Sequence, residues 1–280
     1  MIVTLLTDFG TADYYVGAMK GAVLSVNPSA RILDLTHEVP AHDVEAGAFT
    51  LAAASETFPA GTVHVAVVDP GVGSARRALV VEGGGQLFVG PDNGLFGLVY
   101  ERLGEFRVRH ITDRSYFRPH VSATFHGRDL FAPVAGALSK GVGPSAFGPL
   151  VGDFVRLALA RPRRLPDGAL EAAVLHVDRF GNCVTNISPR DLTAGEAAGG
   201  ARFLVGGREI TRARRFYAEE EPGPVESPAG GSRGGASEGG GAGAPFVIWG
   251  SAGLLEISVN RDSAARLLGV GRGARVVVRG

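Results

Sequence analysis

The chain has 280 residues, of which 45% are hydrophobic, and this is enough apolar material for two domains with separate cores. Charged residues make up 20% of the chain and balance to a formal net charge of +0, so the composition carries no signature of a nucleic-acid-binding or membrane-surface protein. A single cysteine excludes an internal disulfide framework. Without a signal-type N-terminus or an apolar segment of bilayer length, the sequence predicts a cytoplasmic protein with no membrane partner.

The N-terminal part of the chain alternates short apolar runs of strand type with stretches of helical periodicity. The predicted strands are residues 2–6, 31–35, 63–68, 78–81 and 87–89. The predicted helices are residues 14–26, 44–54, 95–103 and 130–138. This alternation is typical of a layered α/β domain, in which helices pack on a sheet. Ligands of such sheets collect at the carboxyl ends of the strands, where Asp8 and Asp69 are expected.

A Pro- and Arg-rich segment, "ARPRRLPDG" at residues 160–168, is typical of an interdomain linker. The pattern then changes to short β runs at residues 170–177, 202–205, 246–249, 254–259 and 274–278, which predicts a small all-β domain. We therefore expect domains at residues 1–160 and 168–280. Residues 221–245 contain nine glycines and no aromatic residue, and we predict a flexible insertion at a loop tip there.

The stretch "VVDPGVGSARR" places charged side chains where one predicted strand ends and another begins. A plain turn needs Gly and Pro for their backbone angles, but it needs neither the carboxylate of Asp69 nor the guanidinium of Arg76. His126, in "TFHGRD", precedes a predicted helix. If these three residues converge, an acid, a guanidinium and an imidazole can hold and deprotonate one water. Singly, each also fits an ordinary structural role, and their spacing leaves that choice open.

Asp8, in "LLTDFGTADYY", either caps the following helix or accepts hydrogen bonds from a vicinal diol such as that of ribose. Asp13 is predicted to be the N-cap of the helix that begins near residue 14. In "HVDRFGNCVTNIS", Phe180 and Asn182 offer a flat ring and an amide, as a purine pocket does, although a β-turn explains them equally. In the alternating run "GLLEISVN", Glu256 falls on the face opposite its apolar neighbours, so solvent exposure is expected for it.

Several familiar signatures are absent from the sequence. It contains no G-x-x-x-x-G-K-[ST] phosphate loop, no G-x-S-x-G nucleophile elbow and no paired Cys/His spacing of a metal site. A bound metal is therefore not expected.

A series of sequence blocks nonetheless occurs in order along almost the whole chain: "LLTDFG", "DLTHEVPAHDVEAGAF", "VVDPGVGSARR", "FVGPDNGLF", "TFHGRDLFAPVA", "VDRFGNCVTNI" and "GSAGLLEISVNRDSAA". With these blocks the sequence closely resembles the S-adenosyl-L-methionine (SAM) hydrolases, also called SAM hydroxide adenosyltransferases, which are relatives of SAM-dependent fluorinases and chlorinases. The resemblance implies an N-terminal α/β domain, a C-terminal β-barrel and a homotrimer. It also implies that SAM is the substrate, that no cofactor is needed, and that the site lies between neighbouring subunits.

The resemblance further implies roles for individual residues. Those that match the set that binds and activates the attacking water are Asp69, Arg76 and His126. Asp8 matches the aspartate that grips the ribose hydroxyls. Those that match adenine contacts or the block that closes over the nucleoside are Phe180, Asn182, Tyr217, Ser251, Glu256, Asn260 and Arg261.

The halogenases are the sharpest alternative within this resemblance. In fluorinases a tyrosine stands at the position of Asp69, a threonine at Val72 and a halide-contacting serine at Gly127. Here those hydroxyls are missing, and an ionised Asp69 would repel a halide anion. The sequence therefore favours attack by water at the ribose C5′ carbon, which yields adenosine and methionine. A halogenase and a non-catalytic module that binds SAM or adenosine remain as alternatives.

Overall fold

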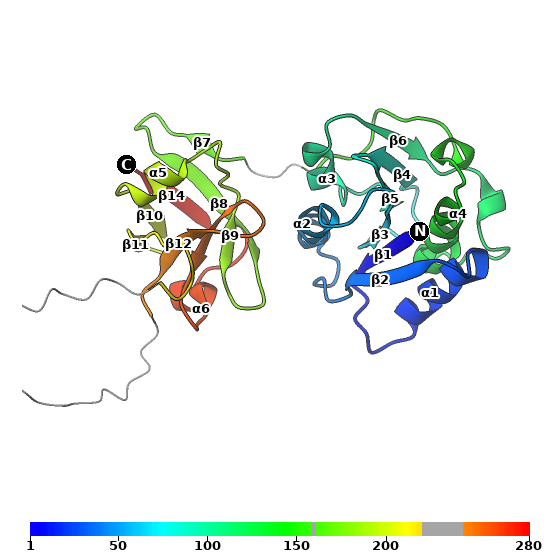
Figure 1. The fold of residues 1–280 in the computed structure, drawn as a ribbon, viewed down its shortest axis with the longest axis horizontal. Coiled ribbons are helices and arrows are strands. Elements are labelled where there is room, and N and C mark those ends of the chain that lie inside the picture. Colours follow the sequence, from blue (N-terminus) through cyan, green and yellow to red (C-terminus); the bar gives the residue numbers. More distant parts are fainter. Residues whose placement is uncertain (158–160, 220–242) are drawn as a thin grey trace, which may run out of the picture. The chain divides into compact units, whose positions relative to one another are not determined.

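The computed structural model describes residues 1–157, 161–219 and 243–280, which form two compact units, Met1–Ala158 and Leu159–Gly280 (Figure 1). Each unit has a hydrophobic core of its own. Most of the predicted insertion, residues 221–242, lies outside the described residues, as does the first residue of the predicted linker. None of the helices in the described part of the chain is both long and apolar enough to span a bilayer.

The N-terminal unit is built on a six-stranded sheet with the order β2-β1-β3-β5-β4-β6. Its strands are β1 (Ile2–Thr7), β2 (Arg31–Thr36), β3 (Val63–Val67), β4 (Ala78–Gly83), β5 (Gln86–Pro91) and β6 (Phe106–His110). Strands β2, β1, β3 and β5 are parallel, while β4 pairs antiparallel with both β5 and β6. All predicted strands of this half are present. Strand β6, "FRVRH", is not among the predicted strands, because arginines separate its two apolar residues.

Helices cover both faces of this sheet, as Figure 1 shows. They are α1 (Tyr15–Val26), α2 (Val44–Ser55), α3 (Gly97–Arg102) and α4 (Ala132–Ser139), with short helices η1 (Arg114–Tyr116), η2 (Gly127–Phe131) and η3 (Pro144–Phe147). Alternation along the strands decides the faces: Val65 and Val67 of β3 pack with residues of α1 and α4, whereas Ala66 packs with residues of α2 and α3. The central strands β1, β3, β5 and β4 are therefore mostly buried on both faces, and polar groups lie at their ends.

Two helix starts differ from the sequence predictions. Asp13 does not cap α1, because Tyr14 occupies the cap position and no side chain hydrogen-bonds there. The helix predicted from residue 130 is α4, and it is preceded by the π-helical turn η2 directly after His126. Such turns insert an extra residue into a helix, re-aim the side chains beside them and are frequent at functional sites.

The C-terminal unit contains an eight-stranded sheet with the order β11-β10-β14-β8-β9-β13-β12, and β7 also pairs with β8. The strands are β7 (Arg163–Arg164), β8 (Leu170–Val177), β9 (Cys183–Thr185), β10 (Arg202–Val205), β11 (Arg208–Ile210), β12 (Phe246–Trp249), β13 (Leu255–Ser258) and β14 (Arg275–Arg279). Ala213, just after β11, forms a bridge with Val247 of β12, so the two ends of the sheet approach one another. The sheet is thus nearly barrel-shaped.

The description of this unit as all-β omits two short helices, α5 (Ala194–Ala198) and α6 (Ala264–Leu268). Helix α5 begins with a capping box in which Thr193 and Glu196 bond reciprocally to each other's backbone N–H. The sequence "TAGE" contains this signal, although a helix of one turn is too short to show a periodic pattern. The core under the sheet includes Cys183, which is fully buried.

Candidate active site

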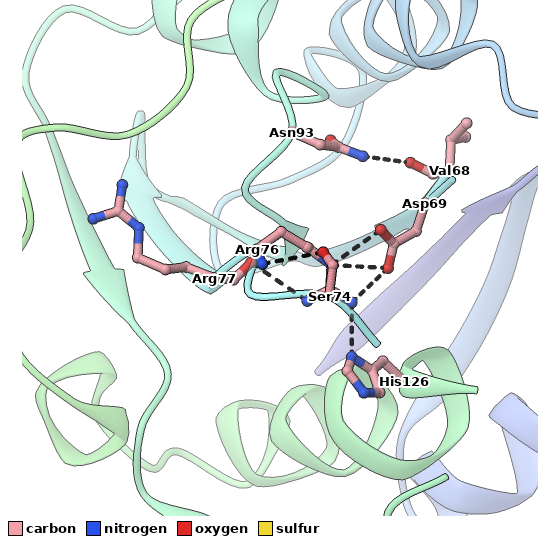
Figure 2. A network of polar contacts seen from close by, with 7 residues as sticks. All are labelled: Val68, Asp69, Ser74, Arg76, Arg77, Asn93 and His126. Atoms are coloured by element: carbon pink, nitrogen blue, oxygen red, sulfur yellow. Dashed lines mark hydrogen bonds and ion pairs between the residues drawn. The ribbon is translucent and has the colours of Figure 1, made fainter. Parts of the chain in front are cut away.

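Asp69, Arg76 and His126 converge in the N-terminal unit, and we call them the Asp–Arg–His cluster (Figure 2). Arg76 Nε lies 3.0 Å from each carboxylate oxygen of Asp69, and Arg76 Nη2 lies 2.5 Å from Oδ2. The same Nη2 lies 2.8 Å from Nδ1 of His126. The side chains of Arg76 and Asp69 are only 9% and 4% exposed. The structure therefore brings together three residues whose convergence their spacing left open.

The hydrogen bond from Arg76 decides the state of the His126 ring. A guanidinium carries donors only, so Nδ1 must accept and the neutral ring carries its proton on Nε2. Burial and the neighbouring Arg76 charge lower the pKa of His126, while Asp69 and Asp129 oppose that shift. His126 is thus neutral near pH 7. Protonation of Nδ1 would place its N–H against the N–H of Arg76 Nη2, and the hydrogen bond between them would be lost.

The backbone between β3 and β4 explains why this loop is rich in glycine. Gly73 has φ +79°, and a Cβ atom there would lie 2.4 Å from the carbonyl oxygen of Ala123. Only glycine permits that approach. Ser74 Oγ accepts a hydrogen bond from the Arg76 N–H at 3.2 Å, and the Phe131 ring lies 5.2 Å below the Arg76 guanidinium. The loop is therefore folded tightly around the ion pair.

Arg76 and Arg77 are adjacent but point in different directions, as Figure 2 shows. Arg77 Nε donates to Asp92 at 2.8 Å, and its Nη1 donates to Asp153 at 2.7 Å. Asp92 in turn accepts the N–H of Val155 at 2.8 Å. Arg77 therefore ties residues 153–155 to the sheet, and only Arg76 takes part in the cluster.

Asp8 leaves the sheet at the same edge as the cluster, because Thr7 of β1 pairs with Val67 of the neighbouring parallel strand β3. The Asp8 side chain does not cap α1. Its Oδ2 accepts the N–H of His42 at 2.8 Å. His42 has φ +66°, a left-handed conformation that costs a non-glycine residue about 1 kcal/mol or more. This strained contact fixes one carboxylate oxygen and leaves Oδ1 for another partner.

Most of the residues predicted to bind the nucleoside line one pocket of about 840 Å³ in the C-terminal unit. We call it the C-terminal pocket. The predicted residues that line it are Phe180, Asn182, Tyr217, Ser251, Glu256 and Arg261. Asn260 is half-buried beside it and is not among its lining residues. Asn260 and Arg261 lie between the bridged residues Val259 and Asp262, and Arg261 has a left-handed φ of +57°.

Asp178 organises one wall of this pocket. Its Oδ1 accepts the N–H groups of Phe180 and Asn182 at 2.9 and 2.8 Å, and its Oδ2 accepts the Asn182 side-chain amide at 2.9 Å. The main-chain carbonyl oxygen of Asn182 accepts the N–H of Asp178 at 3.1 Å, so the side-chain oxygen Oδ1 is the acceptor left for a ligand. The same turn presents the Phe180 ring, and Phe180 is 76% exposed. Asp178 was not among the predicted binding residues, although the spacing of "DRFGN" is that of an Asx-turn.

Glu256 contradicts the expectation of solvent exposure, because it is only 6% exposed. Strand β13 lies between β9 and β12, and all four of its residues are buried, so alternation gives it no solvent face. Glu256 packs so closely over Gly250 that a Cβ there would overlap Oε1. The hydroxyl of Tyr217 donates to Glu256 Oε2 at 2.8 Å. Burial and the charge of Asp178 raise the pKa of Glu256, and burial with the Glu256 contact raises the pKa of Tyr217 to about 12.

Comparison with known proteins decides the family. Residues 3–148 match the SAM hydroxide adenosyltransferase N-terminal domain, and residues 172–277 match the C-terminal domain of the same family. The chain belongs to the SAM hydroxide adenosyltransferase family. It is 38% identical to the "(R)-S-adenosyl-L-methionine hydrolase" of Thermus thermophilus over 98% of both chains, and 39% identical to that of Salinispora arenicola over 99% and 97%. A fluorinase of an Actinoplanes species is more distant, at 28% identity over 68% of this chain and 73% of the fluorinase.

Solved structures of two similar chains show the same fold. A protein of Thermotoga maritima superimposes with a TM-score of 0.86 at 34% identity, with 100% of each chain covered. A protein of Thermus thermophilus superimposes with a TM-score of 0.73 at 37% identity, with 99% of each chain covered.

The structure bears on two of the three positions considered for the halogenase alternative, Gly127 and Asp69. A Cβ atom at Gly127 would lie 3.1 Å from the sulfur of Met19 and 3.4 Å from the Phe125 ring, so a serine there would have to displace its neighbours. Asp69 is ion-paired with Arg76. Across the described ranges, no three His, Cys, Asp or Glu side chains gather as a metal site requires.

Proposed function

We propose that this protein hydrolyses SAM to adenosine and methionine. The main observation behind the proposal is that the ion pair of Asp69 and Arg76, at the carboxyl end of the parallel strand β3, meets His126 in a chain of this family. Full-length relatives at 38% and 39% identity bear the name SAM hydrolase, whereas three fluorinases match at 28%, 26% and 24%.

The chemistry needs a strong nucleophile rather than an acid. A sulfonium is already a good leaving group, but bulk water has a pKa of about 15.7. In the proposed step, water attacks C5′ of the ribose in line with the C5′–S bond, and the bonding electrons leave with the sulfur of methionine. Asp69 accepts the proton of the water, an effect worth roughly 10²–10⁴-fold. Arg76 stabilises the developing hydroxide, and the neutral His126 holds Arg76 in place through Nδ1.

Substrate alignment is the second part of the proposal. The Oδ1 oxygen of Asp8 accepts the ribose hydroxyls. Phe180 and Tyr217 contact the adenine ring, and the side-chain oxygen Oδ1 of Asn182 accepts from the adenine amino group. The further binding residues are Ser251, Glu256, Asn260 and Arg261. Holding the substrate in the attack geometry can supply about 7–11 kcal/mol of the barrier.

We further propose the arrangement that the family resemblance implies. The protein is a cytoplasmic homotrimer in which the cluster of one subunit and the C-terminal pocket of its neighbour bind one SAM molecule. No cofactor or metal enters the reaction, because the cluster supplies both the acceptor and the positive charge that the attack requires.

The test is an incubation of the purified protein with SAM, followed by chromatography of the products, with and without chloride or fluoride. Adenosine and methionine in equal amounts, independent of halide, are the expected result. Halogenated adenosine that forms only with halide would show a halogenase instead. Tight binding of adenosine with no product in any arm would show a binding module and would contradict the proposal.

A further inference from the structure

Asp129 is a fully buried carboxylate beside the Asp–Arg–His cluster, and the mechanism above does not use it. It lies on η2, the π-helical turn that begins directly after His126. An acidic side chain buried to this degree is costly unless it is paired and hydrogen-bonded.

The contacts of Asp129 hold one segment of the chain, residues 118–125, at both ends. Its side-chain Oδ2 accepts the N–H of Ser122 at 2.9 Å. Its main chain accepts the N–H of Arg118 at 3.0 Å and donates to the carbonyl oxygen of Phe125 at 3.2 Å. Arg128 adds two hydrogen bonds, from Nε to Oδ1 at 2.7 Å and from Nη2 to Oδ2 at 2.9 Å. Although burial alone would raise it, the contacts with Arg128 and Ser122 lower the pKa of Asp129, so the group is ionised at neutral pH.

The segment that Asp129 holds touches both sides of the proposed reaction site. The carbonyl oxygen of Ala123 presses against Gly73 in the loop that carries Arg76. Phe125 contacts the ring of Phe9, which follows Asp8, with the ring centroids 6.0 Å apart. His126 follows the segment directly. A shift of residues 118–125 would therefore move the cluster relative to the ribose-binding carboxylate.

The charge of Asp129 also acts on the His126 ring. The charged groups that face His126 are Arg76 and Asp69, from the loop after β3, and Asp129 from its own turn. Arg76 disfavours the imidazolium, whereas the two carboxylates favour it. Removal of one carboxylate therefore shifts the balance toward the neutral ring.

We propose that Asp129 is a positioning residue for the hydrolysis. It holds residues 118–125 against the loop of Arg76, and its negative charge favours the imidazolium form of His126. The proposal rests on the proposed function for its kinetic part only.

The kinetic experiment compares Asp129→Asn and Asp129→Glu with Asp113→Asn in the full-length enzyme. Asp113 is a matched control, because it also accepts a backbone N–H, that of Ser115, but it is exposed and does not act on His126. Asp129→Asn is expected to lower kcat about 10- to 100-fold, as a small misplacement of the reacting groups does. KM is expected to stay within about threefold, because binding contacts are kept. Asp113→Asn is expected to match the wild type.

The second experiment follows the His126 ring by NMR titration, with the signal assigned through His126→Asn. The titration midpoint is expected to move to lower pH in Asp129→Asn and to stay in place in Asp129→Glu and Asp113→Asn. An unchanged midpoint in a folded Asp129→Asn variant would overturn the proposal, even if kcat fell, because a merely structural role predicts that pattern. Wild-type kcat in Asp129→Asn would overturn it as well.

If Asp129→Asn does not fold, Asp129→Glu is used for the test instead, because it keeps the charge and displaces the carboxylate. It is expected to show a wild-type midpoint with a reduced kcat, and a wild-type kcat would contradict the positioning role. If the wild-type enzyme does not hydrolyse SAM, the proposed function fails, while the NMR titration still tests the coupling of Asp129 to His126.

Discussion

The Asp–Arg–His cluster and the C-terminal pocket differ in how open they are and in how their polar groups are held. In the cluster, three side chains from two distant segments hydrogen-bond directly to one another. The side chains of Asp69 and Arg76 are nearly buried, and His126 is half-buried. In the pocket, the Phe180 ring is exposed to solvent. The polar side chains of Asn182 and Glu256 are held by hydrogen bonds to Asp178 and Tyr217. A closed, charge-dense cluster suits proton transfer, because its dipoles need no reorganisation. An open aromatic pocket suits recognition of a planar base. We therefore expect substitutions in the cluster to act on kcat and those in the pocket to act on KM.

The strongest test of this division is Asp69→Asn. The amide keeps the shape of the carboxylate but cannot take the proton of water, so kcat is expected to fall roughly 10²–10⁴-fold. Calorimetric titration with SAM is expected to show nearly unchanged binding. The control is Asp153→Asn, which removes the charge of an 83% exposed partner of Arg77. It should leave kcat and the affinity for SAM unchanged, because exposed ion pairs contribute little to stability. Wild-type turnover in Asp69→Asn would remove Asp69 from the mechanism.

A substitution in the pocket should give the converse result. Phe180→Ala removes an exposed ring, and the loss of base stacking, worth about 1–3 kcal/mol, is expected to raise KM between about 5- and 150-fold. In contrast, kcat should change little. Phe216→Ala provides the matched control, because Phe216 is also exposed but does not line the pocket. A fall in kcat at constant KM would show that the pocket takes part in the chemistry.

The pH dependence of kcat sharpens the comparison further. Burial and Arg76 lower the pKa of His126 below its ordinary value of 6.5, so activity should persist below that pH. It should then fall as Nδ1 is protonated and its hydrogen bond with Arg76 is lost. The pH–rate profile of His126→Asn should lack this fall in kcat at low pH (the acid limb). The plateau value of kcat in the variant should be lower than in the wild type. An acid limb that survives in the variant would have to come from a group other than His126.

The smallest expected effect concerns the stability of the pocket. The pKa of Glu256 is raised in the folded state, which means that its protonated form is the better tolerated one. Ionisation of Glu256 therefore destabilises the folded protein. The destabilisation is absent below the pKa of Glu256 in the unfolded chain and reaches its full size above the raised pKa of the folded state. Glu256→Gln should flatten the decline in stability that begins above the ordinary glutamate pKa of 4.5, as measured by urea denaturation at several pH values. A steeper decline in the variant would contradict the assignment.

Much of the architecture follows from local patterns, because buried parallel strands such as β1 and β3 are short apolar runs and need no tertiary information. Patterns failed where tertiary packing decided the outcome. Glu256 alternates as an exposed residue would, yet neighbouring strands bury it. The sequence shows two adjacent arginines after the glycine-rich loop, and only the fold reveals that Arg76 turns to Asp69 while Arg77 turns to Asp92.

The same limit applies to the candidate site. That His126 meets Arg76 across 50 residues depends on the approach of residues 118–125 to Gly73, which no local pattern encodes. Asp129 was overlooked for a related reason. An acidic residue near a helix start resembles a solvated cap, and its complete burial is visible only in three dimensions.

The burial of Cys183 has a practical consequence for experiments on this enzyme. Burial, with a contribution from the charge of Asp178, raises the pKa of this thiol to about 11, so it stays protonated and inaccessible to maleimide reagents near neutral pH. Because it is the sole cysteine of the chain, a thiol engineered at any surface position would be the one that reacts. Fluorophores could then be attached site-specifically to follow catalysis, without first building a cysteine-free background.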